Sequence, residues 1–349
     1  MTTDAEALKN AATLPASAYH DPTVYEHERR AVFGHEWQLA GFRHHLRGPG
    51  DYVSQDVAGA QIFVIVKPDG ALRAFHNVCR HRAGPLVSGA TGTCTNLVCQ
   101  YHGWSYDFDG TLLKARDFGD ASGFEPLEYG LLPVQVDEWR GLVFVHLDAG
   151  ADVAPLAAAL GPLFAECTEL PIESLTYSHR AEHELGCNWK TYVDNYSEGY
   201  HIPLVHPELN RDLSAKQYRV HVHDHYCLHT APARDGAIYA GKWLWRYPNL
   251  ALNLYPDGMT VERIVPTGPR STRIVYDYLF ADVSPDAAAA NAEKVRISAD
   301  VLDEDRRICE VVQHNLESGV YDTGRLSPRH ENGVFAFQQW VRDSLAAHP

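Results

Sequence analysis

The chain has 349 residues, of which 45% are hydrophobic and 21% charged, so its composition is that of a globular protein rather than a disordered or fibrous one. This length predicts about two domains. The formal net charge of −15 disfavours a nucleic-acid partner, because proteins that bind the phosphate backbone are usually basic. No run of about 18 apolar residues predicts a membrane-spanning helix, and the first residues lack the apolar core of a secretory signal. We therefore expect a cytoplasmic protein that does not bind a membrane.

The elements predicted along the chain divide it into three parts. Residues 1–37 are expected to be helical and to pack on the last domain. Residues 38–150 contain short β-rich runs, such as 61–66 and 142–147, separated by Gly and Pro turns, which predicts a small all-β domain. An alanine-rich stretch at 149–160 marks the next boundary. Residues 151–349 combine strands expected at 218–229, 250–255 and 272–280 with helices expected at 188–199 and 284–318, so the fold class is α+β.

Two mixed pairs of cysteine and histidine stand in the β-rich part. The chain has seven cysteines and twenty histidines, and an odd number of cysteines favours metal or thiol chemistry over a disulfide framework. Cys79 and His81 form one pair, and Cys99 and His102 form the other. Because each pair supplies one sulfur and one nitrogen, the two cysteines can hold one iron and the two histidines another. That is the arrangement of a Rieske [2Fe–2S] cluster.

A zinc site is the alternative for these four residues. Zinc fingers place two cysteines before two histidines, with a helix between them. Here each pair mixes the two residue types and the surroundings are β-rich, so we favour the cluster. Cys94 lies between the pairs and is expected to be a small buried hydrophobic residue.

A second group of metal-binding side chains is expected in the last domain. His201 and His206 are five residues apart, with Pro203 between them. We expect Pro203 to end the preceding helix, so that the imidazoles come from its last turn and the loop beyond. Two histidines and one carboxylate form the facial triad of non-haem Fe(II) oxygenases, which leaves coordination positions open for O2 and substrate.

The third ligand is expected on the helix at 284–318, which carries Asp303, Glu304 and Asp305 in succession. Helical spacing puts Asp305 in the middle of an apolar face, Asp303 on the polar side and Glu304 at the margin. A carboxylate in an apolar face is costly unless it is paired or binds a metal, so Asp305 is the predicted ligand, with an arginine salt bridge as the alternative. The other predicted members of this face are Leu302, Ile308, Cys309, Val312 and Leu316.

A cluster of histidines at 221–229 offers a competing metal site. Alternate spacing would put His221, His223 and His225 on one face of a strand, where they could bind zinc. His229 follows shortly after. We favour a structural role for all four, because the triad is complete without them, although one of the four could face the substrate cavity.

Two segments resemble one known family. Residues 77–110, with the motifs CRHRAG and CQYHGWSYDFDG, resemble the Rieske domain of the aromatic-ring-hydroxylating oxygenases, in the catalytic α subunit. The stretch EDRRICEVVQ resembles that family's E-D-x-x-x-x-E-x-V-Q signature, whose Asp is the third iron ligand. The resemblance implies that Cys79 and Cys99 hold one iron of the cluster, and that His81 and His102 hold the iron nearer to solvent. It also implies a helix-grip catalytic domain, in which a curved antiparallel sheet grips a long C-terminal helix.

The resemblance also assigns a role to Glu198, three residues before His201. Both were expected on one helix face. The family has an acidic residue here, usually Asp, which joins the iron ligand His201 to the cluster histidine, His102, of a neighbouring subunit. A solvated surface Glu is the alternative. The family further implies a homotrimer, O2 as co-substrate, and electrons from a separate NAD(P)H-dependent reductase of the flavin or ferredoxin type. This chain has no GxGxxG after a strand, so we expect no NAD or flavin on it.

The substrate is predicted from the branch of the family that the chain resembles most, which includes choline monooxygenase, carnitine monooxygenase and the betaine demethylases. This implies hydroxylation or N-demethylation of a small quaternary ammonium compound, which aromatic faces would hold by cation–π attraction. One alternative is ring hydroxylation of an aromatic acid, which would need a basic pocket residue such as Arg246 or Arg263. A second is a non-catalytic Rieske electron carrier. The predicted aromatic contacts are Tyr226, Trp243, Trp245 and Tyr255.

Overall fold

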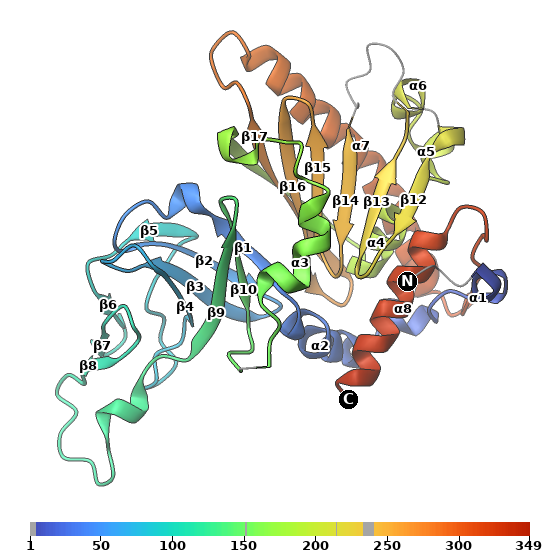
Figure 1. The fold of residues 1–349 in the computed structure, drawn as a ribbon. Coiled ribbons are helices and arrows are strands. Elements are labelled where there is room, and N and C mark those ends of the chain that lie inside the picture. Colours follow the sequence, from blue (N-terminus) through green and yellow to red (C-terminus); the bar gives the residue numbers. More distant parts are fainter. Residues whose placement is uncertain (1–4, 151, 214, 233–240) are drawn as a thin grey trace. The chain divides into compact units, whose positions relative to one another are not determined.

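The computed structural model describes residues 5–150, 152–213, 215–232 and 241–349 (Figure 1). It consists of two compact units. The first, called here the β unit, is Phe33–Gly161; the second, called the large unit, joins Met1–Val32 to Pro162–Pro349. Domain boundaries were expected after residues 37 and 150, whereas the chain passes from one unit to the other after residues 32 and 161. Helix α3 (Leu156–Ala165) spans the second of these points.

The β unit is built on two antiparallel sheets. Side chains alternate across its strands, so Phe63, Ile65 and Phe75 enter one core together with Cys79 and Cys99. The larger sheet runs in the order β1 (Gln38–Phe42), β10 (Leu142–His146), β9 (Pro133–Trp139), β4 (Leu72–His76), β3 (Ala60–Val66), β2 (Asp51–Val57) and β5 (Thr91–Thr93). The smaller sheet consists of β6 (Leu97–Val98), β7 (Ser105–Tyr106) and β8 (Leu112–Lys114).

The large unit contains one antiparallel sheet whose strands follow the chain, except that the first strand closes beside the last. Helices α4 (Trp189–Tyr196) and α7 (Ala288–Leu316) lie on the same face of this sheet (Figure 1). The expected α+β fold is confirmed. The strand order is β11 (Thr176–Leu185), β17 (Ser271–Phe280), β16 (Gly258–Gly268), β15 (Leu250–Tyr255), β14 (Lys242–Arg246), β13 (Tyr226–Thr230) and β12 (Arg219–Val222).

The N-terminal segment belongs to the large unit. It contains α1 (Ala5–Asn10) and α2 (Pro22–Ala31). Glu28 on α2 is fully buried and forms an ion pair with the fully buried Lys190 on α4, with Nζ 2.6 and 2.8 Å from the two carboxylate oxygens. Glu28 also accepts a hydrogen bond from the indole N–H of Trp189, so this carboxylate ties α2 to the start of α4.

The last helix was missed in the sequence. Helix α8 (Asn332–Ala347) buries Val334, Phe337, Trp340 and Val341, which recur at helical spacing and could have predicted it. It packs against α2 and α4.

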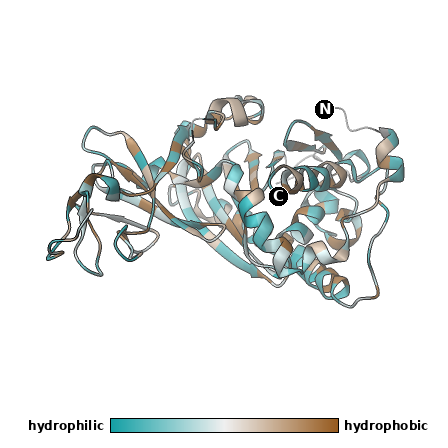
Figure 2. Cartoon of the chain, turned by 90° about the horizontal axis from the view of Figure 1, so that it is seen from below, coloured by the Kyte–Doolittle hydropathy of each residue, from teal (hydrophilic) through white to brown (hydrophobic). Residues whose placement is uncertain are grey.

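Strand register divides the side chains of the large sheet between two faces. Across β13 to β16, His229 pairs with Trp243, Trp243 with Asn253, and Asn253 with Thr260. In the next inward-facing row, Trp245 pairs with Ala251, and Ala251 pairs with Glu262. Both rows face α4 and α7, and we call this the inner face. Hydrophobic and hydrophilic residues are interspersed along the elements of both units (Figure 2), and none of the helices described is long and apolar enough to cross a membrane.

The predicted alternation of His221, His223 and His225 on one strand face is wrong. β12 ends at Val222, and His225 adopts a positive φ of 57° in the turn before β13. His223 instead stacks on Tyr226, and His225 packs against Trp340 of α8. A hairpin turn at this point therefore separates the three imidazoles.

Candidate active site

His201 and His206 flank the short helix α5 (Ile202–Val205), one at each end. Pro203 was expected to end the preceding helix, but α4 already ends at Tyr196 and Pro203 lies in the first turn of α5. Proline is tolerated there because the first helical N–H groups have no partner within the helix. One short turn of helix therefore separates the two imidazoles and brings both rings to the same point.

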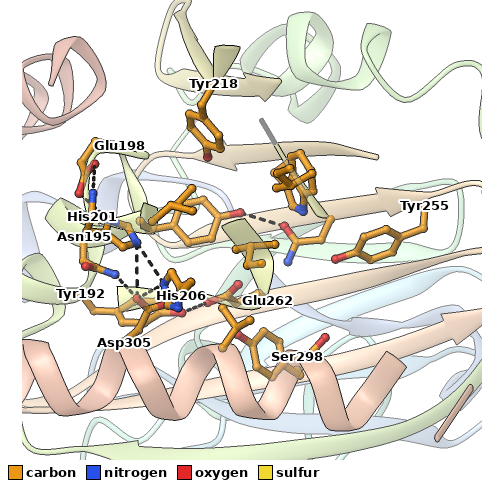
Figure 3. Close-up of a pocket in the computed structure, with 18 residues that line it drawn as sticks. Tyr192, Asn195, Glu198, His201, His206, Tyr218, Tyr255, Glu262, Ser298 and Asp305 are labelled. Atoms are coloured by element: carbon orange, nitrogen blue, oxygen red, sulfur yellow. Dashed lines mark hydrogen bonds and ion pairs between the residues drawn. The ribbon is translucent and has the colours of Figure 1, made fainter. Parts of the chain in front are cut away.

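Three ligand atoms converge beside α5. His206 Nε2 lies 3.2 Å from His201 Nε2 and 2.9 Å from Asp305 Oδ1, and His201 Nε2 lies 3.6 Å from the same carboxylate oxygen (Figure 3). Atoms about 2.1 Å from one ion and at right angles to one another lie about 3 Å apart. The three side chains thus fit one metal ion of octahedral preference, with the opposite face of the ion left open.

The three consecutive acids on α7 point in different directions. Asp303 forms ion pairs with Arg306 and Arg307 on the outside of the helix. Asp305 is 8% exposed and faces the histidines. The predicted buried face is only partly right, because Ile308 and Val312 are 39% and 40% exposed. The buried residues are Leu302, Asp305, Cys309, Gln313 and Leu316.

A second carboxylate orients each imidazole. Glu198 Oε1 lies 2.6 Å from His201 Nδ1, and Glu304 Oε2 lies 2.7 Å from His206 Nδ1. A carboxylate on one ring nitrogen fixes the tautomer and leaves the other nitrogen for a metal. Glu198 does not share a helix face with His201, because α4 ends before it, yet the contact is made within the connecting turn. The contact of Glu304 was missed, since at the margin of the apolar face it had no clear signal.

A cavity opens beside these ligand atoms, between the inner face of the sheet and helices α4 and α7. Acidic side chains reach it from β16, from α7 and from the turn after α4. In the described part of the chain, no arginine or lysine lines it. The aromatic residues in its wall are Tyr192, Tyr196, Tyr218, Trp243, Tyr255 and Tyr276, and the acids are Glu198, Glu262 and Asp305 (Figure 3).

Two of the four predicted aromatic contacts line the cavity. Trp243 and Tyr255 are among its residues. Trp245 is on the same sheet face but is covered by α8, where its ring stacks on Trp340 at 6.1 Å. Tyr226 pairs with Arg246, so it points to the opposite face of the sheet. Tyr226 and Trp245, which are predicted substrate contacts, therefore do not line this cavity.

The two arginines considered for an acidic substrate also lie away from the cavity. Arg246 pairs with Leu250, and Leu250 pairs with Arg263, which puts both side chains on the outer face of the sheet. Arg263 there forms an ion pair with the fully buried Asp277 at 3.4 Å.

The cysteine and histidine pairs of the β unit come together at two loops. Cys79 follows β4 and Cys99 follows β6, and both are 2% exposed. The rings of His81 and His102 are 4.5 Å apart between centroids, with His81 stacked on Trp104. The Nδ1 atom of His81 is buried without a hydrogen-bond partner, which is the state expected of a nitrogen that ligates a metal.

The residues around the two cysteines also leave room for a cluster. A Cβ atom on Gly84 would lie 2.8 Å from the sulfur of Cys99, so only glycine leaves room for the thiolate here. The hydroxyl of Tyr106 lies 3.2 Å from the sulfur of Cys79. Two buried thiols, two less buried imidazoles and an orphaned ring nitrogen fit a [2Fe–2S] cluster. Cys94 lies beside the same core and is partly buried.

Comparison with known families agrees with both sites. The Rieske [2Fe-2S] domain matches residues 36–125, and the ring hydroxylating alpha subunit (catalytic domain) matches residues 172–234 and 229–347. The chain belongs to the ring-hydroxylating oxygenase α-subunit family, and is an oxygenase that uses a [2Fe–2S] cluster and a mononuclear non-haem iron. The alternative of a non-catalytic electron carrier is not supported.

Its relatives include proteins that oxidise quaternary ammonium compounds. The chain is 31% identical to the chloroplastic choline monooxygenase of Beta vulgaris over 351 residues, which is 97% of this chain and 78% of that one. It is 31% identical to the carnitine monooxygenase oxygenase subunit of Escherichia coli (strain K12), covering 88% and 85%.

Solved structures resemble the whole chain. The quaternary ammonium Rieske monooxygenase CntA in complex with L-carnitine is 28% identical, with a TM-score of 0.84 and coverage of 100% of this chain and 99% of that one. Naphthalene 1,2-dioxygenase from Rhodococcus sp., at 20% identity and a TM-score of 0.79 over 97% and 95% of the two chains, shares the fold.

Proposed function

We propose that this protein is the terminal oxygenase of a Rieske system that hydroxylates or N-demethylates a small quaternary ammonium or betaine-type compound. The observation that carries the proposal is the composition of the cavity wall, which combines six tyrosine and tryptophan rings with three carboxylates and, within the described residues, no arginine or lysine. Aromatic faces and negative charge both attract a cation.

The same wall disfavours the alternative substrate. An aromatic acid has a net negative charge and, unlike a betaine, no cation of its own. Its carboxylate would lie beside Glu198, Glu262 and Asp305, and no arginine or lysine of the described residues lines the cavity to offset that repulsion. The names of the relatives, choline and carnitine monooxygenases, favour the same class of substrate.

We assign the metal ligands from the geometry described above. His201, His206 and Asp305 would hold the mononuclear iron, and Cys79, His81, Cys99 and His102 would hold the cluster. When bound, the cluster would relay electrons from the reductase and the mononuclear iron would activate O2. The side chains of the cavity bind and orient the substrate beside the open face of the triad, and Glu198 and Glu304 hold the two imidazoles in position.

Electron supply and assembly complete the proposal. We infer a head-to-tail homotrimer in which Glu198 joins the iron site of one subunit to the cluster histidine His102 of the next. A CntA structure reported to reveal inter-subunit electron transfer favours this arrangement. A separate NAD(P)H-dependent reductase would supply the electrons. We place the protein in the cytoplasm, which is supported by the five cysteines outside the cluster, since none of them forms a disulfide.

Metal analysis and a substrate panel test the function. About three irons per chain are expected, two in the cluster and one in the triad. Choline, carnitine and γ-butyrobetaine are compared with benzoates, with NADH-dependent O2 uptake and formaldehyde as readouts. O2 uptake coupled to benzoates alone would overturn the substrate class, and two irons per chain would overturn the triad. His201→Ala should keep the visible absorption of the cluster and lose coupled O2 uptake.

A further inference from the structure

One carboxylate in the cavity has no part in the iron site as described so far. Glu262 lies on the inner face of β16 and is 1% exposed, yet it lines the cavity (Figure 3). The other two acids of the wall belong to the iron site, since Asp305 is a candidate ligand and Glu198 contacts the candidate ligand His201. A buried carboxylate is costly unless something compensates for its charge.

Polar neighbours hold Glu262 in one orientation but do not neutralise it. The hydroxyl of Tyr192 donates a hydrogen bond of 2.7 Å to Oε1, and the side chain of Asn253 forms a second hydrogen bond with the carboxyl group. Tyr196 in turn donates to the carbonyl oxygen of Asn253 at 2.8 Å, which directs the amide nitrogen toward the carboxyl group. Two neutral donors thus fix the carboxylate, and among the described residues no arginine or lysine lines the cavity to offset its charge.

The surroundings of Glu262 make it responsive to a cation. Burial raises the pKa of Glu262 to about 7, hydrogen bonds from Tyr192 and Asn253 lower it, and the charge of Asp305 raises it. The cavity wall also carries the titratable groups of the iron site, Glu198, His201 and His206, and tyrosines on α4, β15 and β17. Burial raises the pKa of Tyr192, Tyr196 and Tyr276 well above the usual value and that of Tyr255 to about 12, so all four stay neutral near pH 7.

We propose that Glu262 is the anionic partner of the substrate's quaternary ammonium group, and that it determines the preference of this enzyme for a cation over an uncharged molecule of the same shape. Aromatic rings also hold the carbon isostere of a trimethylammonium group by apolar contact, whereas a carboxylate favours only the charged compound. The inference rests on the proposed function, because it assumes a quaternary ammonium substrate.

Binding of matched compounds tests the role of Glu262. Choline is compared with 3,3-dimethylbutan-1-ol, and γ-butyrobetaine with 5,5-dimethylhexanoate, since each second compound replaces the nitrogen by carbon. Dissociation constants are measured by calorimetry on the iron-loaded protein. Wild type should prefer the cation of each pair. Glu262→Gln should reduce the affinity for the cation about tenfold to a hundredfold and leave the isostere unchanged. Glu262→Asp, which retains the charge, should keep most of the preference.

A matched control tests whether the effect requires a carboxylate in the cavity or follows from the loss of any buried carboxyl group. Asp194 accepts hydrogen bonds from Tyr19 and Gln338, does not line the cavity, and burial raises its pKa to about 7 as well. Asp194→Asn should keep the full preference for the cation. Melting curves and iron content show whether each variant folds.

The pH dependence gives a second readout. Neither choline nor 3,3-dimethylbutan-1-ol titrates near neutral pH, so a change in their relative affinity reports on the protein. Glu262 must be ionised to attract the cation, so the preference should rise as the pH increases through about 7 and level off above it. In Glu262→Gln it should be flat.

The outcomes distinguish the two proposals. If wild type binds neither cation, the proposed function is wrong and the role of Glu262 falls with it. If wild type prefers the cation and Glu262→Gln, folded and iron-loaded, shows the same preference and the same pH profile, the role of Glu262 alone is wrong.

Discussion

At the scale of single residues, three consecutive acids on α7 make three different contacts. Each step along a helix turns the side chain by about 100°, so Asp303 reaches two arginines, Glu304 reaches His206 Nδ1 and Asp305 reaches His206 Nε2. One imidazole is thus held between two neighbouring carboxylates of the same helix. The outer contact to Glu304 orients the ring, while the inner contact is a candidate metal site.

Removal of Glu304 should therefore weaken iron binding without touching a proposed ligand. We expect Glu304→Gln to lower the affinity for iron about tenfold to a hundredfold, because His206 loses its orienting carboxylate. Iron content after dialysis against a chelator of known strength measures this. Asp303→Asn, one residue earlier and paired outside the site, is the control and should retain iron. Equal iron loss in the two variants would contradict the orienting role.

His229 is a buried imidazole behind the cavity wall. It is fully buried, its Nδ1 lies 2.9 Å from the hydroxyl of Tyr218, and its Nε2 has no hydrogen-bond partner. Burial, and then the nearby His221, lower its pKa from 6.5 to about 3. The folded protein therefore keeps this ring neutral, whereas in the unfolded chain the ring would become protonated below pH 6.5.

The stability of the protein should depend on this ring in weakly acidic solution. The pKa of His229 is lower in the folded protein than in the unfolded chain. Its contribution to the free energy of unfolding should therefore be complete above pH 6.5 and decrease as the pH falls toward 3, by up to about 1.4 kcal/mol per pH unit. His229→Asn keeps an acceptor for Tyr218 and removes the titration. Urea unfolding at pH 7.5, 6.5 and 5.5 should show the wild type losing more stability on acidification than the variant. Parallel losses would exclude His229 as a source of acid sensitivity.

Turns decide where the metal-binding side chains go at the scale of elements. α5 is a single short helix with Pro203 in its first turn, and it separates His201 from His206. In the β unit, Cys79 and Cys99 follow strands, and the loop after Cys79 includes a left-handed residue, Ala83, with φ of 55°. These loops need small residues where the backbone passes close to a sulfur.

Gly84 is the position where this need is strongest. Gly84→Ala would put a methyl group 2.8 Å from the sulfur of Cys99, so we expect loss of cluster and of its visible absorption, with one iron per chain retained in the large unit. Gly161→Ala makes the same change on helix α3 with no atom within 4 Å of the new carbon. That control should keep the cluster, and a Gly84→Ala protein with full absorption would show that the loop can shift.

At the scale of the whole molecule, the two metal sites lie in two separate units. Contacts within each unit define each site, whereas the proposed electron path joins units of neighbouring subunits. A head-to-tail ring repeats one heterologous contact, so each subunit would donate electrons at one side and accept them at the other.

Mixed oligomers test this path. A chain with His102→Ala lacks a proposed cluster ligand, and a chain with His201→Ala lacks a proposed iron ligand, so each alone should be inactive. Co-expressed at equal levels and randomly assembled, they should regain about a quarter of wild-type activity, because one contact in four pairs a cluster with an iron site. Equal amounts of the two proteins purified separately and not allowed to exchange subunits are the control. Absence of any recovery in the mixed oligomer would contradict transfer between subunits.

The sequence by itself identified the groups of metal-binding residues, through their local spacing. The pairs at 79–81 and 99–102, the histidines at 201 and 206, and the choice of Asp305 over Asp303 all follow from short-range backbone geometry, which the chain specifies within a few residues. The α+β class and the long helix α7 were predictable for the same reason. The buried face of α7 was less predictable, because Ile308 and Val312 are apolar and yet exposed.

Only the tertiary structure decided which side chains line the cavity. Trp243 and Trp245 have the same spacing on one strand face, but α8 covers one and leaves the other at the cavity. Glu262 belongs to the wall because β16 pairs with β15 and β17 in one register. Register and covering helices depend on contacts between residues far apart in the chain, so the spacing of neighbours cannot reveal them.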